Sequence, residues 1–197
     1  MLRKGFLGQL SDWVQEELMQ RDAQGFERSA IAFGFDKYEI ESLEDSGKLA
    51  GMFAEWNVFD CKHEPFEHQT GLEYFIKHNP LGLDEEDIVA YTDLLVNEVG
   101  LFAVKEVERG RGVFVESLST GETHFIHDVN TSLSVQPDET LWARIASVRG
   151  LYHAVGCIVL PLPMTMLGDM RTAIRTWEKN SMNTKEMARW LFGERGD

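Results

Sequence analysis

A cysteine and two histidines lie close together in the chain, and these residue types bind metal ions. Cys61, His63 and His68 fall in one short segment together with Glu64 and Glu67. Thiolate and imidazole ligands suit zinc, which takes about four donors in a tetrahedron. A fourth donor would have to be a glutamate or a distant side chain, and a neighbouring lysine would repel the cation. We therefore predict a polar loop rather than a metal site, with Cys61, His63 and His68 as the weak metal candidates.

The other chemically active residues do not form a catalytic group either. His124 and His127 flank Phe125 and Ile126, and alternate residues of a strand face opposite sides, so the two imidazoles cannot converge. Cys157 lies in an apolar segment, where a thiol behaves as a small hydrophobic side chain. The sequence contains no GxSxG or HExxH signature. We predict no catalytic residue.

Arginines next to glycines form the third candidate site. Arg109-Gly110-Arg111-Gly112 resembles a phosphate-binding loop, but neither a GxxxxGK[ST] run nor a strand-GxGxxG-helix unit is present. A hairpin turn that exposes two arginines is the better interpretation. Trp142 and Arg144 also lie near turns, and binding hot spots are enriched in tryptophan and arginine. We predict Arg109, Arg111, Trp142 and Arg144 as partner-binding residues.

The charge of the chain is acidic and unevenly distributed. The 197 residues carry a net charge of -14, with 21 acidic and 8 basic residues up to position 100, and 12 and 11 after it. Such a chain lacks the clustered cations that grip phosphate backbones over a broad surface. A nucleic-acid partner is therefore disfavoured but stays open, because basic residues are interleaved with Trp177 and Trp190 near the C-terminus.

The composition places the protein among soluble globular chains. Hydrophobic residues make up 43% and charged residues 26%. Two cysteines are too few for a disulfide framework, and no apolar run approaches the roughly 18 residues of a membrane span. We expect a cytoplasmic protein without a membrane partner.

Residues 1–100 are predicted to form an acidic helical domain. Phe6, Leu10, Val14 and Leu18 recur with the helical period, and polar residues separate them. The segment from Lys62 to Thr70 is interpreted as a loop, a short helix follows it, and a last helix begins near Asp84. Gly100 is expected to cap that last helix at its C-terminal end.

From Leu101 the spacing changes to an alternation of apolar and polar residues, which is typical of strands. Turn sequences occur at 109–112, 119–122 and 149–150. Four or five short strands are too few for a sandwich, and closing them would remove exposed edges. We predict an α+β protein: the helical domain, a small antiparallel β-barrel of the Src-homology-3-like or a similar kind over 101–163, and C-terminal helices over 164–197 that pack on the rest.

Short aromatic and glycine motifs between residues 53 and 163 carry a resemblance to a known group. They are FAEWNVFD (53–60), GLEYF (71–75), GLFAV (100–104), VFV (113–115) and STGE (119–122). This region resembles the upstream region of bacterial proteins that often end in a SEC-C zinc-binding motif. The segment from Lys62 to Gln69 looks like extra material, and the cysteine-rich SEC-C tail is absent after Leu160. The resemblance therefore implies an architecture, and neither a zinc site nor catalytic residues.

Taken together, these observations predict a non-catalytic cytoplasmic interaction module. It would bind a protein or a ribonucleoprotein partner through the β-barrel, without a cofactor. Two alternatives remain. One is a metal-assisted hydrolase that uses Cys61, His63 and His68 with a carboxylate. The other is an acidic nucleic-acid mimic, in which the first half of the chain imitates phosphates.

Overall fold

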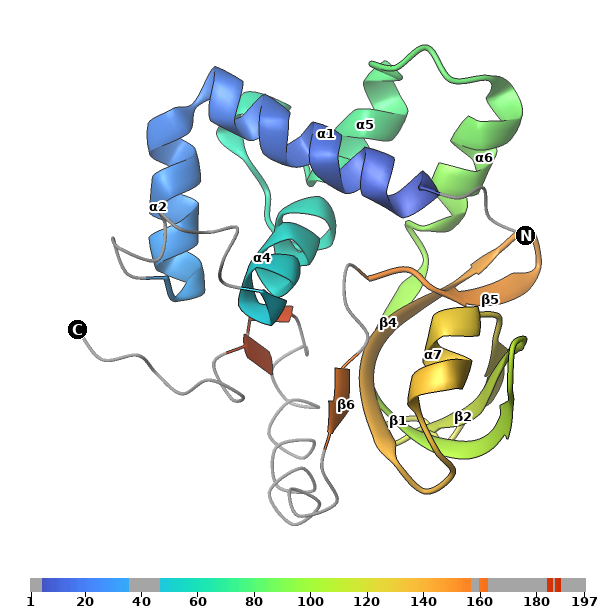
Figure 1. Cartoon of the computed structure of the whole chain (residues 1–197). Helices are drawn as coiled ribbons and strands as arrows, with labels where there is room; N and C mark the ends of the chain where they lie inside the picture. Colours follow the sequence, from blue (N-terminus) through green and yellow to red (C-terminus); the bar gives the residue numbers. More distant parts are fainter. Residues whose placement is uncertain (1–4, 36–46, 157–159, 163–183, 186, 189–197) are drawn as a thin grey trace. The chain divides into compact units, whose positions relative to one another are not determined.

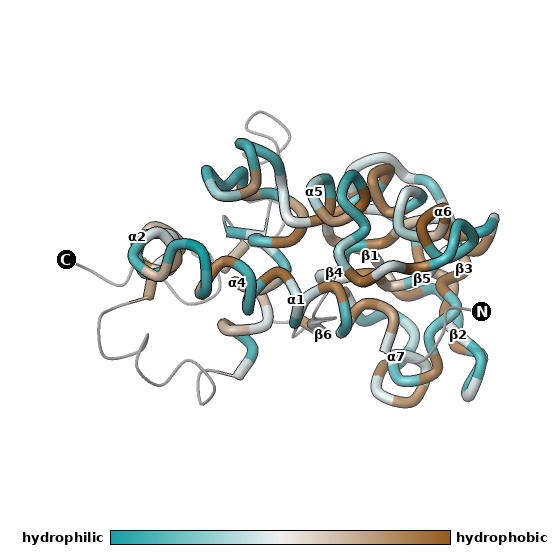
Figure 2. Tube along the Cα trace, turned by 90° about the horizontal axis from the view of Figure 1, so that it is seen from above, coloured by the Kyte–Doolittle hydropathy of each residue, from teal (hydrophilic) through white to brown (hydrophobic). Residues whose placement is uncertain are grey.

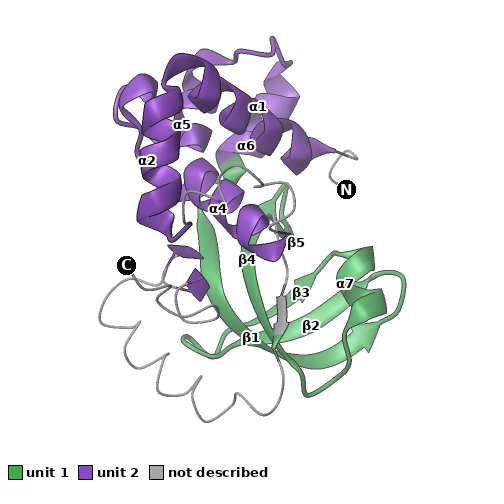
Figure 3. Ribbon diagram, turned by 60° about the vertical axis from the view of Figure 1, so that its left-hand side comes forward, with its two compact units in different colours: residues 1, 93–182 green, residues 2–92, 183–197 purple. Residues whose placement is uncertain are grey.

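The chain folds into two compact units. The computed structural model describes residues 5–35, 47–156 and 160–162, and residues 184, 185, 187 and 188. A barrel unit comprises residues 93–182, and a helical unit comprises residues 2–92 together with residues 183–197 (Figure 3). The helical unit is thus built from both ends of the sequence, and the barrel lies between them along the chain.

The described part of the helical unit consists of short helices. They are α1 (Phe6–Arg21), α2 (Ala23–Phe33), α4 (Lys48–Phe59), the 3-10 helix η2 (Glu64–Phe66), α5 (Gly71–His78) and α6 (Glu85–Asp93). Helix α1 buries Phe6, Leu10, Val14 and Leu18, as the helical period predicts. Figure 2 shows the resulting alternation of hydrophobic and hydrophilic residues along α1.

Local sequence signals fix the ends of two helices. The Oδ1 atom of Asp22 accepts the backbone N–H of Gly25 at 2.8 Å, which caps the N-terminus of α2. Helix α5 begins with a capping box: Thr70 Oγ1 accepts the N–H of Glu73 at 3.2 Å, and Glu73 Oε2 accepts the N–H of Thr70 at 2.8 Å. It ends at His78, and its C-cap Asn79 adopts a left-handed conformation with φ 41° just before a proline.

The barrel unit contains six described strands and one helix. They are β1 (Asn97–Glu108), β2 (Gly112–Ser117), β3 (Thr123–Ile126), α7 (Val129–Ser134), β4 (Thr140–Val148), β5 (Leu151–Ala154) and β6 (Leu160–Leu162). The strand order is β1-β2-β3-β5-β4-β6, and an additional β1–β4 pairing closes the first five strands into a barrel (Figure 1). This order, with a helix between the third and fourth strands, is the connectivity of the five-stranded Greek-key barrel known as the OB-fold.

Strand β1 closes the barrel because it pairs along both edges. Its residues 97–103 pair with β4, and its residues 102–108 pair with β2. The register shifts between Val104 and Glu106, and such a bulge bends a strand and increases its twist. The interior is filled by the buried side chains of Phe102, Val104, Val113, Val115, Ile126, Val135, Leu141, Ala143 and Ile145.

The structure confirms an α+β protein with a helical N-terminal part and a small β-barrel. The barrel is mixed rather than wholly antiparallel, because β3 and β5 run parallel, and its connectivity is of the OB rather than the Src-homology-3-like kind. Helix α6 ends at Asp93 and β1 begins at Asn97, so Gly100 lies inside a strand and caps no helix.

Most of the C-terminal region predicted to be helical, 164–197, lies outside the described residues. Its four described residues are helical, and Thr184, Met187 and Ala188 are buried. All four belong to the helical unit.

Candidate functional site

The β1–β2 turn presents the first two predicted site residues at the surface. Gly110 has φ 79°, and its N–H donates to Ser132 Oγ of α7 at 2.9 Å, so the turn is anchored to that helix. Arg109 and Arg111 are both exposed. The guanidinium of Arg111 forms an ion pair with Glu108, whereas Arg109 has no ion pair or hydrogen bond with any described residue.

Trp142 and Arg144, the other two predicted residues, are not part of this surface. Their exposed fractions are 0% and 2%. Both lie in β4, which is paired with β1 along one edge and with β5 and β6 along the other. Arg144 Nη1 donates to Asn97 Oδ1 at 2.6 Å. The four predicted residues therefore do not converge: only Arg109 and Arg111 lie together, and burial removes Trp142 and Arg144 as accessible hot spots.

Next to this turn lies an aromatic surface that the sequence analysis missed. Phe114 of β2 is directly opposite Phe125 of β3, and their ring centroids are 4.6 Å apart. The His127 ring meets Phe125 edge-on at 4.7 Å. All three side chains are half-buried. We call Phe114, Phe125 and His127 the β2–β3 face. The alternation itself carries the signal, because Val113 and Val115 are inward and Phe114 must then be outward.

Gly112 allows the β2–β3 face to pack directly beside the β1–β2 turn that contains Arg109 and Arg111. A Cβ atom on Gly112 would lie 3.0 Å from Cζ of Phe125 and only 2.1 Å from the carbonyl oxygen of Ile126. The Phe125 ring therefore covers the backbone at Gly112, immediately after Arg111. Only a residue without a side chain allows β2 and β3 to approach this closely.

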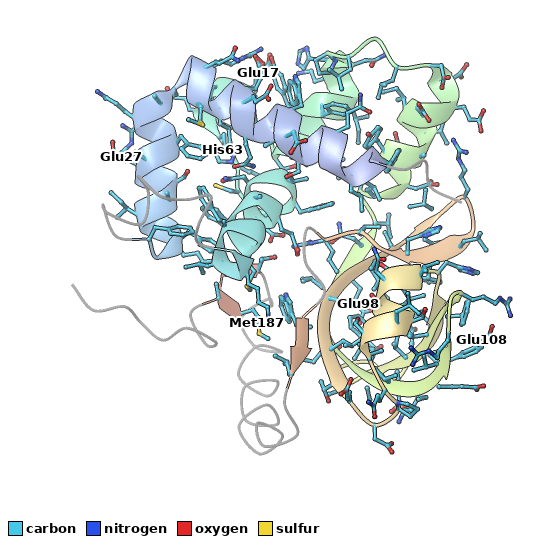
Figure 4. All side chains as sticks on the ribbon, viewed as in Figure 1. Glu17, Glu27, His63, Glu98, Glu108 and Met187 are labelled. Atoms are coloured by element: carbon cyan, nitrogen blue, oxygen red, sulfur yellow. The ribbon has the colours of Figure 1, made fainter. Side chains whose placement is uncertain are left out.

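The barrel also holds a polar cluster that has the residue types of a hydrolase but not the geometry. Ser117 Oγ donates to Glu98 Oε1 at 2.6 Å, and His124 Nε2 lies 3.8 Å from a carboxylate oxygen of Glu98 and 3.8 Å from one of Glu122. In a nucleophile–base pair the imidazole contacts the hydroxyl. Here the hydroxyl of Ser117 contacts the Glu98 carboxylate instead of the His124 imidazole. Ser117 is also only 1% exposed. The arrangement links β1, β2 and β3 and offers no reactive hydroxyl. Glu98 of this cluster lies near the start of β1, and Glu108, which pairs with Arg111 of the turn, is the last residue of that strand (both are labelled in Figure 4).

Among the described residues, the side chains of the Cys61 loop are not grouped as metal ligands. Cys61 Sγ is 3.9 Å from His63 Nδ1, and both side chains are largely withdrawn from water, but His68 is exposed. Burial raises the pKa of the Cys61 thiol to about 11 and lowers the pKa of His63 to about 4. In the described part of the chain, no three His, Cys, Asp or Glu side chains are grouped so that they could hold a metal ion.

Some candidate residues lie outside the described ranges. They are Cys157, Trp177, Trp190 and the C-terminal basic residues other than Lys185. Lys185 is described, and its ammonium group lies 5.7 Å from the centre of the Trp56 ring in the helical unit.

Comparisons with protein-family models, with curated proteins and with solved structures find no match to this chain. The resemblance to the upstream region of SEC-C proteins therefore stays a prediction. None of the described helices has both the length and the apolar character needed to cross a bilayer.

Proposed function

We propose that the chain is a non-catalytic binding module whose barrel binds a protein partner through the β1–β2 turn and the β2–β3 face. One observation carries the proposal: two phenylalanine rings and an imidazole in mutual contact are half-exposed on neighbouring strands, beside two exposed arginines. Aromatic residues and arginine are enriched in the cores of protein interfaces, where a few side chains carry most of the binding energy.

The connectivity of the barrel supports this location. In OB-type barrels, ligands bind at the face of the second and third strands and at the loop between the first and second. The β2–β3 face and the turn with Arg109 and Arg111 occupy those positions here. This argument is an analogy between folds, so it supports the place of binding and says nothing of the ligand.

The charges favour a protein over a nucleic acid. Exposed aromatic rings can stack on bases, but phosphate binding needs several free cations. Residues 93–156 include five basic and nine acidic residues. Lys105 is paired with Glu116 at 2.8 Å and Arg111 with Glu108, which leaves Arg109 as the free cation beside the β2–β3 face in the described barrel.

Neither alternative function gains support from the described residues. The hydrolase would need Cys61, His63 and His68 together with a carboxylate, and no three such side chains among the described residues are grouped so that they could hold a metal ion. The acidic mimic would need carboxylates in a phosphate-like array, and no described feature favours one. A cytoplasmic location is also part of the proposal, and it rests on the sequence alone.

The test is a charge reversal in the turn. The tagged chain captures partners from a cell lysate, and each captured protein is then purified and titrated by calorimetry. Arg109→Glu should weaken binding by about tenfold or more, because Arg109 is the unpaired cation of the surface. Lys62→Glu is the matched control, since Lys62 is exposed and without an ion pair in the described helical unit.

The outcomes are distinct. The proposal is supported by a captured protein that no longer binds the Arg109→Glu variant but still binds the Lys62→Glu variant. The absence of any captured protein, or equal affinity for both variants, overturns it. Tighter binding of single-stranded oligo(U) than of any protein, sensitive to Arg109→Glu, would also overturn it, because the partner would then be a nucleic acid.

A further inference from the structure

The helical unit contains a pocket that the proposed function does not use. It is open, has a volume of about 270 Å³, and lies between α2, Trp56 of α4 and the segment Cys61–Pro65. All of its lining residues belong to the helical unit. The volume is just below the roughly 300–1,000 Å³ usual for ligand sites, so only a small molecule with a single ring fits it.

Two aromatic side chains form rigid walls. Phe26 meets Phe53 edge-on at 5.4 Å, and the Trp56 ring packs against Phe33 at 5.6 Å. Phe33 and Phe53 are buried core residues. Because the walls are fixed by the core, a flat ring can bind without ordering flexible side chains, which removes a large part of the usual cost of binding.

The floor of the pocket is polar but uncharged. Cys61 and His63 line it, with Sγ 3.9 Å from Nδ1. Burial keeps the thiol protonated, with a pKa of about 11, and keeps the imidazole neutral, with a pKa of about 4. His63 is only 8% exposed, and a hydrogen bond to the backbone of Asn57 partly offsets the effect of burial on its pKa. Cys61 is the more exposed residue of this pair, so its thiol is the group of the floor that a ligand hydroxyl meets first.

The rim carries balanced charges. Arg28 lies 3.4 Å from Asp22, whose carboxylate also caps α2, and Lys62 is followed by Glu64 after one residue. Two cations and two anions thus line the pocket. The ammonium group of Lys185 also lies 5.7 Å from the centre of the Trp56 ring. A neutral ligand has no charge to desolvate in such a site.

We propose that this pocket binds a small neutral aromatic molecule with a hydroxyl group, with its ring against Phe26 and Trp56 and its hydroxyl toward Cys61 and His63. A hydroxyl both donates and accepts hydrogen bonds, so it matches a thiol and a neutral imidazole in either tautomer.

The test uses phenol, toluene and cyclohexanol as probes of the full chain. Saturation-transfer NMR and calorimetry should give a Kd for phenol on the order of 1 mM, as expected for so small a ligand. Toluene lacks the hydroxyl and cyclohexanol lacks the flat ring, so each should bind at least about tenfold more weakly.

Paired variants locate the site. Ala32 lines the pocket and is exposed, so Ala32→Phe fills it without disturbing the core. Its neighbour Ile31 is 54% exposed and does not line the pocket, so Ile31→Phe is the control. Phenol should slow the alkylation of Cys61, measured by peptide mass spectrometry, in the native protein and in Ile31→Phe, but not in Ala32→Phe.

Binding of phenol that Ala32→Phe abolishes and Ile31→Phe retains supports the proposal. The proposal is overturned if phenol does not bind at roughly 10 mM, if toluene binds equally well, or if Ala32→Phe leaves binding unchanged. Arg109→Glu lies in the barrel unit and should not affect this binding, which separates a failure here from a failure of the barrel proposal.

Discussion

The substitution Gly112→Ala tests the packing of the β2–β3 face most directly. The added Cβ would lie 2.1 Å from the carbonyl oxygen of Ile126, a backbone atom that no rotamer change can move. Non-bonded heavy atoms prefer separations of about 3.5 Å, so β2 and β3 must part by more than an ångström. Val113 pairs with Ile126 at the next position and would be displaced with it.

The expected cost is about 3 kcal/mol. Overpacking of a filled site costs roughly 1–3 kcal/mol, and a weakened strand hydrogen bond adds about 1 kcal/mol. Gly110→Ala is the control: Gly110 has φ 79°, but no atom lies within 4 Å of its added Cβ, so only backbone strain of about 1 kcal/mol is expected. Gly112→Ala should also weaken partner binding, because the Phe125 ring would be pushed from its place.

Urea denaturation gives the free energy of unfolding, and hydrogen exchange of the β2 and β3 amides assigns the loss to the barrel. Gly112→Ala should lower exchange protection in β2 and β3 more than Gly110→Ala does. If Gly112→Ala destabilises the barrel no more than Gly110→Ala, β2 and β3 can move apart at little cost in free energy. The close approach at Gly112 would then not constrain the residue type.

Three further predictions concern the helical unit. The pKa of His63 is about 4 in the folded chain against 6.5 for the free side chain, so the unfolded chain takes up the proton first as the pH falls. Stability from the neutral imidazole is therefore present above pH 6.5 and is lost toward pH 4, by roughly 3 kcal/mol in total. His63→Phe should flatten this pH dependence of the urea midpoint. His68→Gln changes an exposed histidine and should leave the dependence as it is. The Cys61 thiol, with its pKa raised from 9.0 to about 11, should be alkylated at pH 8 about 100-fold more slowly than a free thiol, and a rate near the free value contradicts its burial. Thr70→Ala removes the capping box of α5 and should cost about 1 kcal/mol in urea denaturation, while Thr70→Ser should restore most of it; equal stability of the two variants would show that the cap does not matter.

The fold class follows from the sequence because its signals are local. The apolar period of α1 and the glycine turns at 109–112 and 149–150 need no knowledge of distant contacts. The end of α6 is different: Leu95 and Val99 fit a helical stripe equally well, and only the pairing of Asn97–Ala103 with β4 makes this segment a strand. The parallel contact between β3 and β5 depends on the closure of the barrel, which no local pattern contains.

The candidate site was predictable only in part, for a related reason. Seven consecutive residues of β4, 140–146, are buried, so no alternation marks an outward side, and Trp142 and Arg144 could not be recognised as interior. The charge of Arg144 suggests exposure, whereas in the structure its guanidinium donates a hydrogen bond to Asn97 in the interior. The β2–β3 face, in contrast, could have been inferred, since Phe114 stands between two inward valines.

The split construction of the helical unit has a consequence for biosynthesis. Thr184 Oγ1 donates to Glu55 Oε1 at 2.9 Å, and both residues are fully buried. A ribosome that has made all of the barrel has not yet made Thr184, so the barrel can close during translation while the earlier-made helices still lack the hydroxyl that meets the Glu55 carboxylate. The part of the protein that emerges first is therefore the part that matures last.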